Sequence, residues 1–467
     1  MRRRDFFRNG MIGVLGTPLI APFRSIAQPG RFEINGKSQA KNIIFMVSDG
    51  MSTGTLAMAD MLRLRMDGRR SHWMSLYEQG KATRALMETA SSSSLVTDSA
   101  AASSSWGGGA RVPNGSLNVG ANGEIYTPIL QKFKAAGKAT GCVTTVPITH
   151  ATPAGFCVNM RSRGDQEDIA LAYLPLKFDV MLGGGDAYFN GSKRKDKKDV
   201  YADFRNAGYE VVNTRTQLNS VSPGNTKPLL GVFAEDGLPY TLDAKQTKED
   251  VPTLAEMTTH AINALNRNKK GFVLQVEGGK VDWGAHSNDA GAMLYDQVAF
   301  DDAIAAAIAF AEKDGNTLVV ITTDHGNSNP GLFYSSKANA GFDRLQKFKY
   351  TNEWILKGLT NTSTAAQVIE RIEAAQGYAI THDEAAELVK HYQQHNEDGV
   401  YNKAKLPYRP LAQIQTNYIS IGWGSMDHSA DHVELAMFGP GSAQLKPFVK
   451  NYELHNFMLN VTGVVRK

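Results

Sequence analysis

Apolar residues along the chain follow two patterns that alternate from residue 42 onward. Short runs are apolar almost throughout, as in strands that a parallel sheet buries on both faces, and the segments between them repeat their apolar residues at helical spacing. The predicted strands cover residues 42–48, 139–146, 178–182, 272–276, 317–323 and 433–438. The predicted helices include residues 55–64, 254–265 and 293–311, with a last helix at about 447–459. The alternation predicts an α/β fold, a three-layer α/β/α sandwich with a central, mostly parallel sheet.

The alternation stops between residues 331 and 423, where the pattern is helical only. Two helix starts there carry capping boxes, Thr364-x-x-Gln367 and Thr381-x-x-Glu384, and the first helix is predicted to end near Gly377. We therefore predict a helical insertion at about residues 331–423, on the active face of the sheet, within one α/β domain of residues 42–467.

The N-terminus has the pattern of a twin-arginine export signal. The run Arg2-Arg3-Arg4-Asp5-Phe6-Phe7-Arg8 precedes an apolar stretch, residues 11–23, and a small-residue site, Ser25-Ile26-Ala27. That stretch is too short for a permanent membrane span, and no later run reaches the ~18 apolar residues that a span needs. We predict a signal peptide of residues 1–27, a linker of residues 28–41, and a mature protein that is periplasmic or secreted.

Composition argues against one class of function, nucleic-acid binding, and does not settle whether the two cysteines form a disulfide. The formal net charge is only +4 in 467 residues, and Lys and Arg form no dense stripe with aromatic residues, which argues against nucleic acid as a specific partner. Cys142 and Cys157, the two cysteines, lie in apolar surroundings. Two buried thiols are the favoured interpretation, and a disulfide formed after export is the alternative.

Side chains that can bind metals follow three of the predicted strands. Asp49 comes after the first strand, Glu277 after Val276, and Asp324-His325 after Thr323. In a parallel sheet the carboxyl ends of the strands meet at one edge. A single aspartate at such a place is often only a turn or a helix cap, but four such residues at three strand ends favour a site for divalent metal ions.

Two further segments add candidate ligands. Asp282 and His286 are four residues apart, so a helix would put both on one face, within reach of one ion; a surface ion pair is the alternative. The segment 423–432, which leads into the last strand, contains His428 and His432, and either histidine could be a ligand.

Ser99 stands where a helix is predicted to begin. In Val96-Thr97-Asp98-Ser99 an acidic residue and hydroxyls precede a run of small residues. Free backbone N–H groups and the helix dipole favour an anion such as a phosphoryl group at this place, which suits a nucleophile. An ordinary capped helix has the same pattern, because Ser and Asp are common N-caps.

With these motifs in this order, the chain resembles the alkaline phosphatase family. The matching blocks are residues 42–51, 96–101, 150–155, 182–185, 276–279, 282–286, 323–326 and 428–430. The resemblance implies an enzyme that hydrolyses small-molecule phosphate monoesters of many kinds and scavenges phosphate. Homodimers are common in the family, so a homodimer is consistent with the resemblance.

The resemblance also implies a set of ligands for two Zn²⁺ ions and one Mg²⁺ ion. The first Zn²⁺ would be held by Asp282, His286 and His428, the second by Asp49, Asp324 and His325, and Mg²⁺ by Asp49, Thr152 and Glu277. His428 is preferred to His432 because the family's ligand opens its block and is followed by two small residues and an acidic one. His150 and Trp283 stand where the family varies its residues and tunes the Mg²⁺ site, which leaves the affinity and identity of the third metal open.

Roles in substrate binding follow from the same resemblance. Arg163 falls at the place of the arginine that grips phosphate, and Arg161 is its competitor. Arg163 is preferred because a bidentate guanidinium must reach the phosphate oxygens from a fixed position. Asp98 would hold Arg163 and would not act as a base.

The implied mechanism proceeds through a phosphoserine on Ser99. No histidine base flanks this serine in the sequence, so its activation would fall to the zinc held by Asp49, Asp324 and His325, and the other zinc would stabilise the leaving alkoxide and activate water. The nearest alternative is a phosphodiesterase or sulfatase of the same superfamily. An alternative of another class is a non-catalytic extracytoplasmic protein that binds phosphate or zinc.

Overall fold

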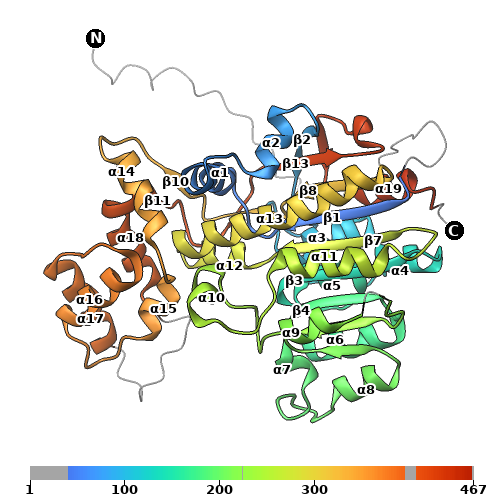
Figure 1. The fold of residues 1–467 in the computed structure, drawn as a ribbon, viewed down its shortest axis with the longest axis horizontal. Helices are drawn as coiled ribbons and strands as arrows, with labels where there is room; N and C mark the ends of the chain where they lie inside the picture. Colours follow the sequence, from blue (N-terminus) through green and yellow to red (C-terminus); the bar gives the residue numbers. More distant parts are fainter. Residues whose placement is uncertain (1–39, 223, 395–405, 465–467) are drawn as a thin grey trace, which may run out of the picture. The chain divides into compact units, whose positions relative to one another are not determined.

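A ten-stranded sheet forms the centre of the computed structural model, which describes residues 40–222, 224–394 and 406–464 (Figure 1). The predicted signal peptide and most of the predicted linker lie outside the described residues. The strand order is β14-β2-β13-β8-β1-β7-β3-β4-β6-β5. The strands are β1 (Asn42–Ser48), β2 (Thr83–Glu88), β3 (Ala139–Pro147), β4 (Val180–Gly184), β5 (Glu210–Val212), β6 (Leu229–Val232), β7 (Phe272–Gly278), β8 (Thr317–Thr322), β13 (Val433–Phe438) and β14 (Phe448–Lys450).

The three central strands run parallel, and their register brings their carboxyl ends together. Val47 of β1 lies opposite Glu277 of β7 on one side and Thr322 of β8 on the other. Every residue of these three strands is buried, as expected for a parallel sheet that is covered on both faces. Any side chain that follows one of these strands therefore emerges beside the ends of its neighbours.

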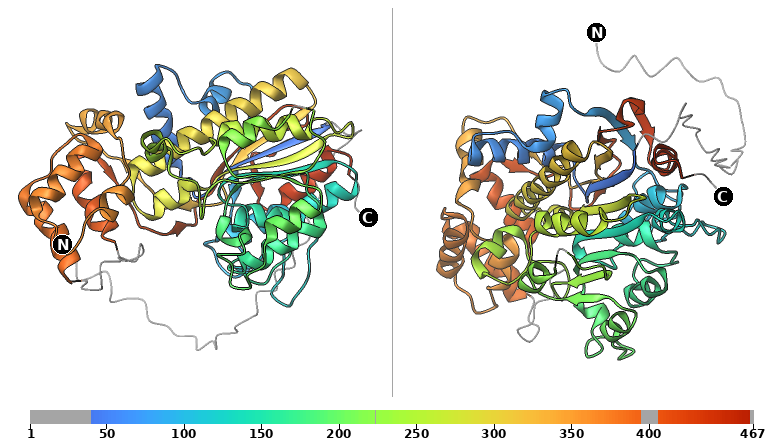
Figure 2. Two further views of the ribbon diagram at one scale, coloured as in Figure 1. Left: turned by 60° about the horizontal axis from the view of Figure 1, so that its bottom comes forward. Right: turned by 45° about the vertical axis from the view of Figure 1, so that its right-hand side comes forward.

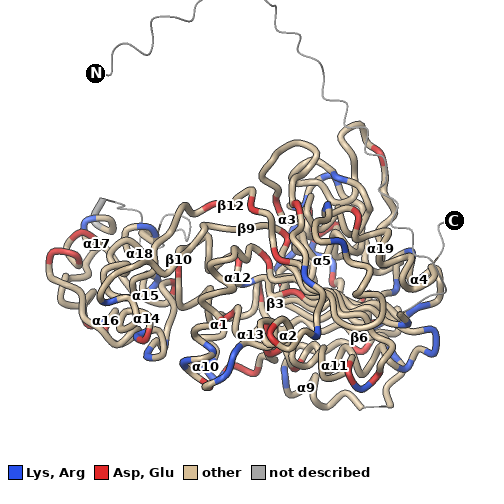
Figure 3. Tube along the Cα trace, turned by 90° about the horizontal axis from the view of Figure 1, so that it is seen from above, with Lys and Arg blue, Asp and Glu red and all other residues tan. Residues whose placement is uncertain are grey.

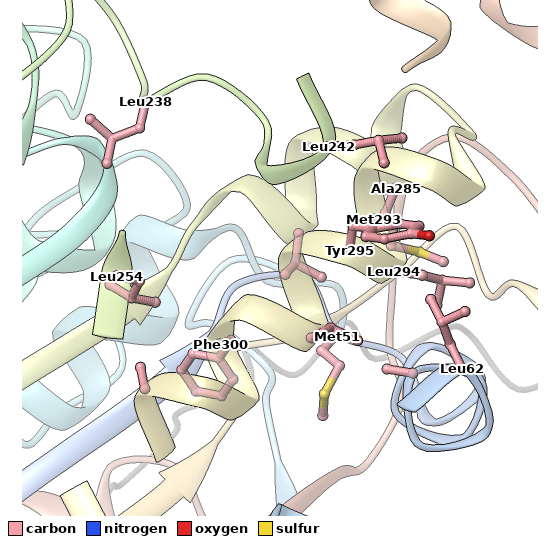
Figure 4. Packing of buried hydrophobic residues seen from close by; sticks show 14 of the residues in the cluster. Met51, Leu62, Leu238, Leu242, Leu254, Ala285, Met293, Leu294, Tyr295 and Phe300 are labelled. Atoms are coloured by element: carbon pink, nitrogen blue, oxygen red, sulfur yellow. The ribbon is translucent and has the colours of Figure 1, made fainter. Parts of the chain in front are cut away.

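Helices cover both faces of the sheet, which confirms the predicted three-layer α/β sandwich (Figure 2). Side chains of β1 alternate between two apolar clusters: Ile44 and Met46 belong to one, and Ile43 and Phe45 belong to the other. The first cluster contains residues of α1 (Thr53–Asp67), α11 (Leu254–Leu265) and α13 (Ala290–Asp314). Figure 4 shows part of it, with Phe300 of α13 among the labelled residues. The second contains residues of α3 (Ser99–Gly108), α4 (Ile129–Ala135), α5 (Ala151–Cys157), α6 (Gln166–Leu176) and α19 (Glu453–Val461).

The C-terminal end of the chain differs from the prediction. A helix was expected at about residues 447–459, but Phe448–Lys450 forms strand β14, parallel to β2, and α19 begins only at Glu453. Only Val449 of the three β14 residues is buried, which is the alternation of an edge strand. Strand β13 pairs antiparallel with both β8 and β2, so the sheet is mixed at this side.

In the described part of the late segment, five α-helices lie in the sequence between two short strands that pair with each other, β10 (Gly331–Leu332) and β11 (Ile421–Gly422). They are α14 (Ala338–Asp343), α15 (Asn352–Lys357), α16 (Ala365–Gln376), α17 (His382–Gln394) and α18 (Tyr408–Ile419). Thr364 and Gln367 form a capping box at the start of α16, and Gly377 ends that helix in the left-handed conformation, with a φ of 76°. A second short pair, β9 (Gly326–Asn327) with β12 (His428–Ser429), follows the carboxyl end of β8.

The two cysteines are free thiols in the apolar interior. Their sulfur atoms are 3.6 Å apart, on β3 and α5, and both side chains are fully buried. Burial raises the pKa of Cys157 well above its ordinary value. Within the described ranges, no helix has the length and apolar character needed to cross a membrane.

Candidate active site

Carboxylates and imidazoles gather where the central strands end. Asp49 follows β1, Glu277 lies near the end of β7, and Asp324-His325 follow β8; all four side chains are fully buried. Acidic residues are visible between α3, α5 and α12 (Lys280–His286) in Figure 3. Buried charges of one sign are costly unless a cation or a proton accompanies them, so this edge of the sheet has the chemistry of a metal site.

The first group consists of Asp282, His286 and His428, whose ligand atoms lie within 4.8 Å of one another. The predicted helix is present as α12, and it places His286 Nε2 3.4 Å from Asp282 Oδ2. His428, on β12, brings its Nε2 to 3.6 Å from Asp282 Oδ1. The competing His432 is not part of this group, and its ring packs against Phe448 at 5.2 Å.

The orientation of the two histidine rings in this group fits a cation between them. His286 Nδ1 lies 2.7 Å from the Met426 carbonyl oxygen, and His428 Nδ1 lies 2.9 Å from that of Thr97. Carbonyl oxygens only accept, so each Nδ1 carries a proton, which leaves Nε2 as the nitrogen that can present a lone pair to a metal. These two Nε2 atoms face each other at 3.0 Å. Burial, together with nearby His325, lowers the pKa of His428, which keeps it in the neutral form that binds metals.

The second group consists of Asp49, Asp324 and His325. His325 Nε2 lies 3.2 Å from Asp324 Oδ2 and 3.5 Å from Asp49 Oδ1. Asp324 Oδ2 accepts no hydrogen bond from a described residue. Burial and the neighbouring carboxylates, first that of Asp324, raise the pKa of Asp49 well above its ordinary value. A divalent cation would relieve this repulsion, so the group fits a metal ion.

The third group shares Asp49 with the second and adds Glu277 and His150. Thr152, a predicted ligand, donates its hydroxyl to Asp49 Oδ2 at 3.3 Å. Glu277 Oε2 accepts from Thr144 at 2.5 Å, whereas Oε1 has no hydrogen-bond partner among the described residues. Burial raises the pKa of Glu277 to about 7. His150, expected only beside this group, is close enough to be counted with its ligands.

Ser99 is the first residue of α3 and lies beside the second group. Its Oγ is 3.5 Å from Asp49 Oδ1 and 3.3 Å from His325 Nε2, and the side chain is buried. No histidine flanks Ser99 in the sequence, and the fold brings His325, a member of the second group, beside it. Asp98 caps the helix by accepting from the Ala101 N–H at 2.9 Å.

Arg163 lies at this site beside Asp98 and His150, whereas the Arg161 side chain does not enter it. Arg163 Nη1 lies 3.1 Å from Asp98 Oδ2, and its Nη2 lies 3.0 Å from His150 Nε2. Burial and the charge of Arg163 lower the pKa of His150 to about 3, so this imidazole is neutral and can accept from Arg163. Trp283 packs edge-on against the His150 ring at 6.2 Å. The Arg161 side chain is exposed to solvent.

Sequence reasoning missed two polar residues at this site, Thr144 and Asn327. Thr144 lies on β3 and binds Glu277; Asn327 is fully buried and donates from Nδ2 to Asp282 Oδ1 at 2.7 Å. The only signal for Asn327 was its place two residues after His325. Amides and hydroxyls that support ligands have no spacing rule of their own, which is why both were passed over.

Carboxylate and imidazole groups meet at the strand ends of an α/β sheet, beside a buried serine. This combination is typical of metal-binding hydrolases. Comparison with known proteins places the chain within that class: it belongs to the alkaline phosphatase family, whose sequence profile matches residues 40–464. The chain is thus an enzyme of this family.

Individual relatives match this chain over most of its length. Alkaline phosphatase 4 of Bacillus subtilis (strain 168) is 30% identical over 431 residues, which cover 91% of this chain and 89% of the relative. Alkaline phosphatase of Escherichia coli (strain K12) is 33% identical over 353 residues, 64% of this chain and 73% of the relative. The crystal structure of Thermus thermophilus alkaline phosphatase has a TM-score of 0.85 at 33% identity and covers 92% of this chain and 93% of its own.

Proposed function

We propose that this enzyme hydrolyses phosphate monoesters to an alcohol and inorganic phosphate through a phosphoserine on Ser99. The observation that carries the proposal is the position of the Ser99 hydroxyl, at the first turn of α3 and within 3.5 Å of ligand atoms of the second metal group. A nucleophile at a helix N-terminus receives the anionic phosphoryl group where free N–H groups point.

The three groups suit two Zn²⁺ ions and one Mg²⁺ ion. Asp282, His286 and His428 would hold one Zn²⁺, and Asp49, Asp324 and His325 the other, because nitrogen and oxygen ligands in threes leave an open position for substrate. Asp49, Thr152 and Glu277 are oxygen ligands, which Mg²⁺ prefers. When bound, such ions stabilise the charge on the attacking and leaving oxygens and activate water at neutral pH.

The protein's own groups then perform the transfer. Ser99 Oγ forms a bond to phosphorus while the bond from phosphorus to the alcohol oxygen breaks; water later cleaves the phosphoserine and releases phosphate. Arg163 and the N–H groups at the start of α3 bind the remaining phosphoryl oxygens. Asp98 holds both the start of α3 and Arg163 in place, since it caps the helix and pairs with the guanidinium. The substrate is gripped through its phosphate, which favours a broad substrate range and a role in phosphate scavenging.

Comparing rates on nitrophenyl phosphate and bis-nitrophenyl phosphate tests this function against its rivals. We expect the monoester to react faster by roughly 10- to 100-fold, because a diester lacks one anionic oxygen and so loses one charge-assisted hydrogen bond of ~1.5–3 kcal/mol. A faster diester reaction would favour a phosphodiesterase, a faster reaction of a nitrophenyl sulfate a sulfatase, and no turnover at all a binding protein.

Arg163→Ala is expected to weaken inhibition by inorganic phosphate and to raise KM for the monoester by roughly 10- to 100-fold, since it removes a charged donor from the phosphoryl oxygens. Arg161→Ala is the matched control, because its exposed side chain lies two residues away in the chain. The measurement is the inhibition constant of phosphate for each variant. A larger effect of Arg161→Ala would transfer the role to Arg161.

We also propose that the mature enzyme is periplasmic or secreted, exported by the twin-arginine route. The support is the N-terminal pattern of arginines, a short apolar stretch and a small-residue site at Ala27. A route that carries folded proteins suits an enzyme that loads its metals before export. Replacing Arg3 and Arg4 with lysine should leave uncleaved precursor in the cytoplasm; normal export of that variant would contradict the route.

A further inference from the structure

Asn327 lies beside the first candidate zinc group and belongs to neither group. It is the last residue of β9, and its side chain is fully buried. Its Nδ2 donates to Asp282 Oδ1 at 2.7 Å, and its Oδ1 accepts from the Ser328 hydroxyl at 2.9 Å. Because an ionised carboxylate only accepts, the amide must present its nitrogen to Asp282. The side chain is thus a dedicated donor to one ligand of the first group.

The backbone of Asn327 connects the same residue to the other ligands. It lies opposite His428 in the antiparallel pair of β9 with β12, and it follows His325 of the second group by two residues. Its N–H donates to Ser52 Oγ at 3.0 Å, and Ser52 stands just before α1 in the segment that begins with Asp49. One residue therefore contacts the chain segments that supply ligands to both groups.

The turn after Asn327 is held in an unusual conformation by side chains. Ser328 and Asn329 both have positive φ, 57° and 40°, which non-glycine residues adopt mainly where their surroundings enforce it. Asn329 Oδ1 accepts from Ser52 Oγ at 2.8 Å and from Ser429 Oγ at 3.1 Å. These bonds tie the turn to α1 on one side and to the His428 strand on the other, so Asn327 is held from both sides.

We propose that Asn327 is a positioning residue, whose side chain fixes the Asp282 carboxylate for the first zinc. Without the amide donor, the carboxylate could rotate about its terminal torsion, and the two imidazoles would lose their aligned third ligand. The inference rests on the proposed zinc sites, and it adds a determinant of metal affinity that touches neither the substrate nor the metal.

Zinc affinity of Asn327→Ala, measured by competition with a chromophoric chelator on metal-free protein, tests this role. Loss of a supporting hydrogen bond to a ligand typically costs about 10- to 100-fold in affinity. We expect this loss for one zinc equivalent, the one that His286→Ala also weakens, with the other equivalent unchanged. Asn327→Ser keeps a shorter donor and is expected to lie between wild type and alanine; it carries the test if the alanine variant does not fold.

Asn352→Ala is the matched control. Asn352 is an equally buried asparagine in α15, whose side chain donates to Gln415 Oε1 at 2.8 Å and accepts from Gln376 at 2.9 Å. Its loss should lower thermal stability and leave zinc affinity unchanged. Unchanged zinc affinity in both Asn327 variants, or an equal loss in Asn352→Ala, would overturn the proposal. A wild type that binds zinc without hydrolysing monoesters would overturn the proposed function and leave the role of Asn327 standing.

Discussion

Ser99→Ala is expected to lower kcat for phosphate monoesters by roughly 10⁴- to 10⁶-fold, the range seen when a covalent nucleophile is removed. The hydroxyl is the only part of the side chain that can form the phosphoserine, and it lies within 3.5 Å of Asp49 and His325. The neighbouring polar groups are engaged elsewhere: Asp98 binds the Ala101 N–H and Arg163, and the Thr97 hydroxyl donates to the Asp98 carbonyl oxygen. The measurement is steady-state turnover of a chromogenic monoester, together with rapid-quench detection of phosphorylated protein.

A serine on the same helix supplies the control for this loss. Ser105 is also fully buried, and its hydroxyl donates to the Ala101 carbonyl oxygen at 3.0 Å, away from the metal groups. Ser105→Ala should keep turnover within a few-fold of wild type, because it removes only a local hydrogen bond of about 1 kcal/mol. A phosphorylated serine still detected in Ser99→Ala would show that the nucleophile is another residue.

Removing the metals by chelation is expected to abolish activity, and adding Zn²⁺ with Mg²⁺ should restore it. Asp49, Glu277 and Asp324 are buried together, and a divalent cation would offset the repulsion between carboxylates that share a buried site. The metal-free protein should also unfold at a lower temperature, because ligands that bind only the folded state stabilise it by about 2.7 kcal/mol at one hundred times their Kd. Activity and thermal unfolding before and after chelation provide the measurement.

The stability of the metal-free protein should depend on pH in a defined direction. Burial raises the pKa of Glu277 to about 7 and that of Asp49 well above its usual range, so both bind protons more tightly in the folded state than in the unfolded state. Their contribution to stability is therefore present at pH 4 and below and is lost as the pH rises toward about 7. With Zn²⁺ and Mg²⁺ bound this loss should be much smaller. Full activity of metal-free protein, or metal-free stability that rises over this pH range, would contradict the assignment.

Local patterns in the sequence predicted the parts of the site that depend on one segment at a time. The run of apolar residues 42–48 forms β1, and Asp49 follows it, as expected of a buried parallel strand. The spacing of Asp282 and His286 predicted one helical face, and α12 brings their side chains to 3.4 Å. These features follow from the periods of helices and strands, which every segment expresses in its own residues.

Such local patterns could not predict contacts between segments that are distant in the sequence. His325 meets Ser99 although 226 positions separate them, because the fold brings the start of α3 to the residues that follow β8. Spacing alone left both His428 and His432 as candidates, and only the resemblance to the family favoured His428. The pairing of β9 with β12 brings His428 to Asp282 and leaves His432 against Phe448. Pairing of this kind depends on the order and direction of strands, which the pattern of apolar residues does not encode.

By itself, the sequence determined the α/β class of this protein, the strand ends at which its chemistry lies, and a small set of candidate ligands. The packed fold alone showed which of these lie within reach of one another, that His150 accepts from Arg163, and that Asn327 donates to Asp282. The physical reason is that secondary structure arises from neighbours along the chain, whereas a buried charge is satisfied by whichever group the packed fold brings within about 3 Å of it.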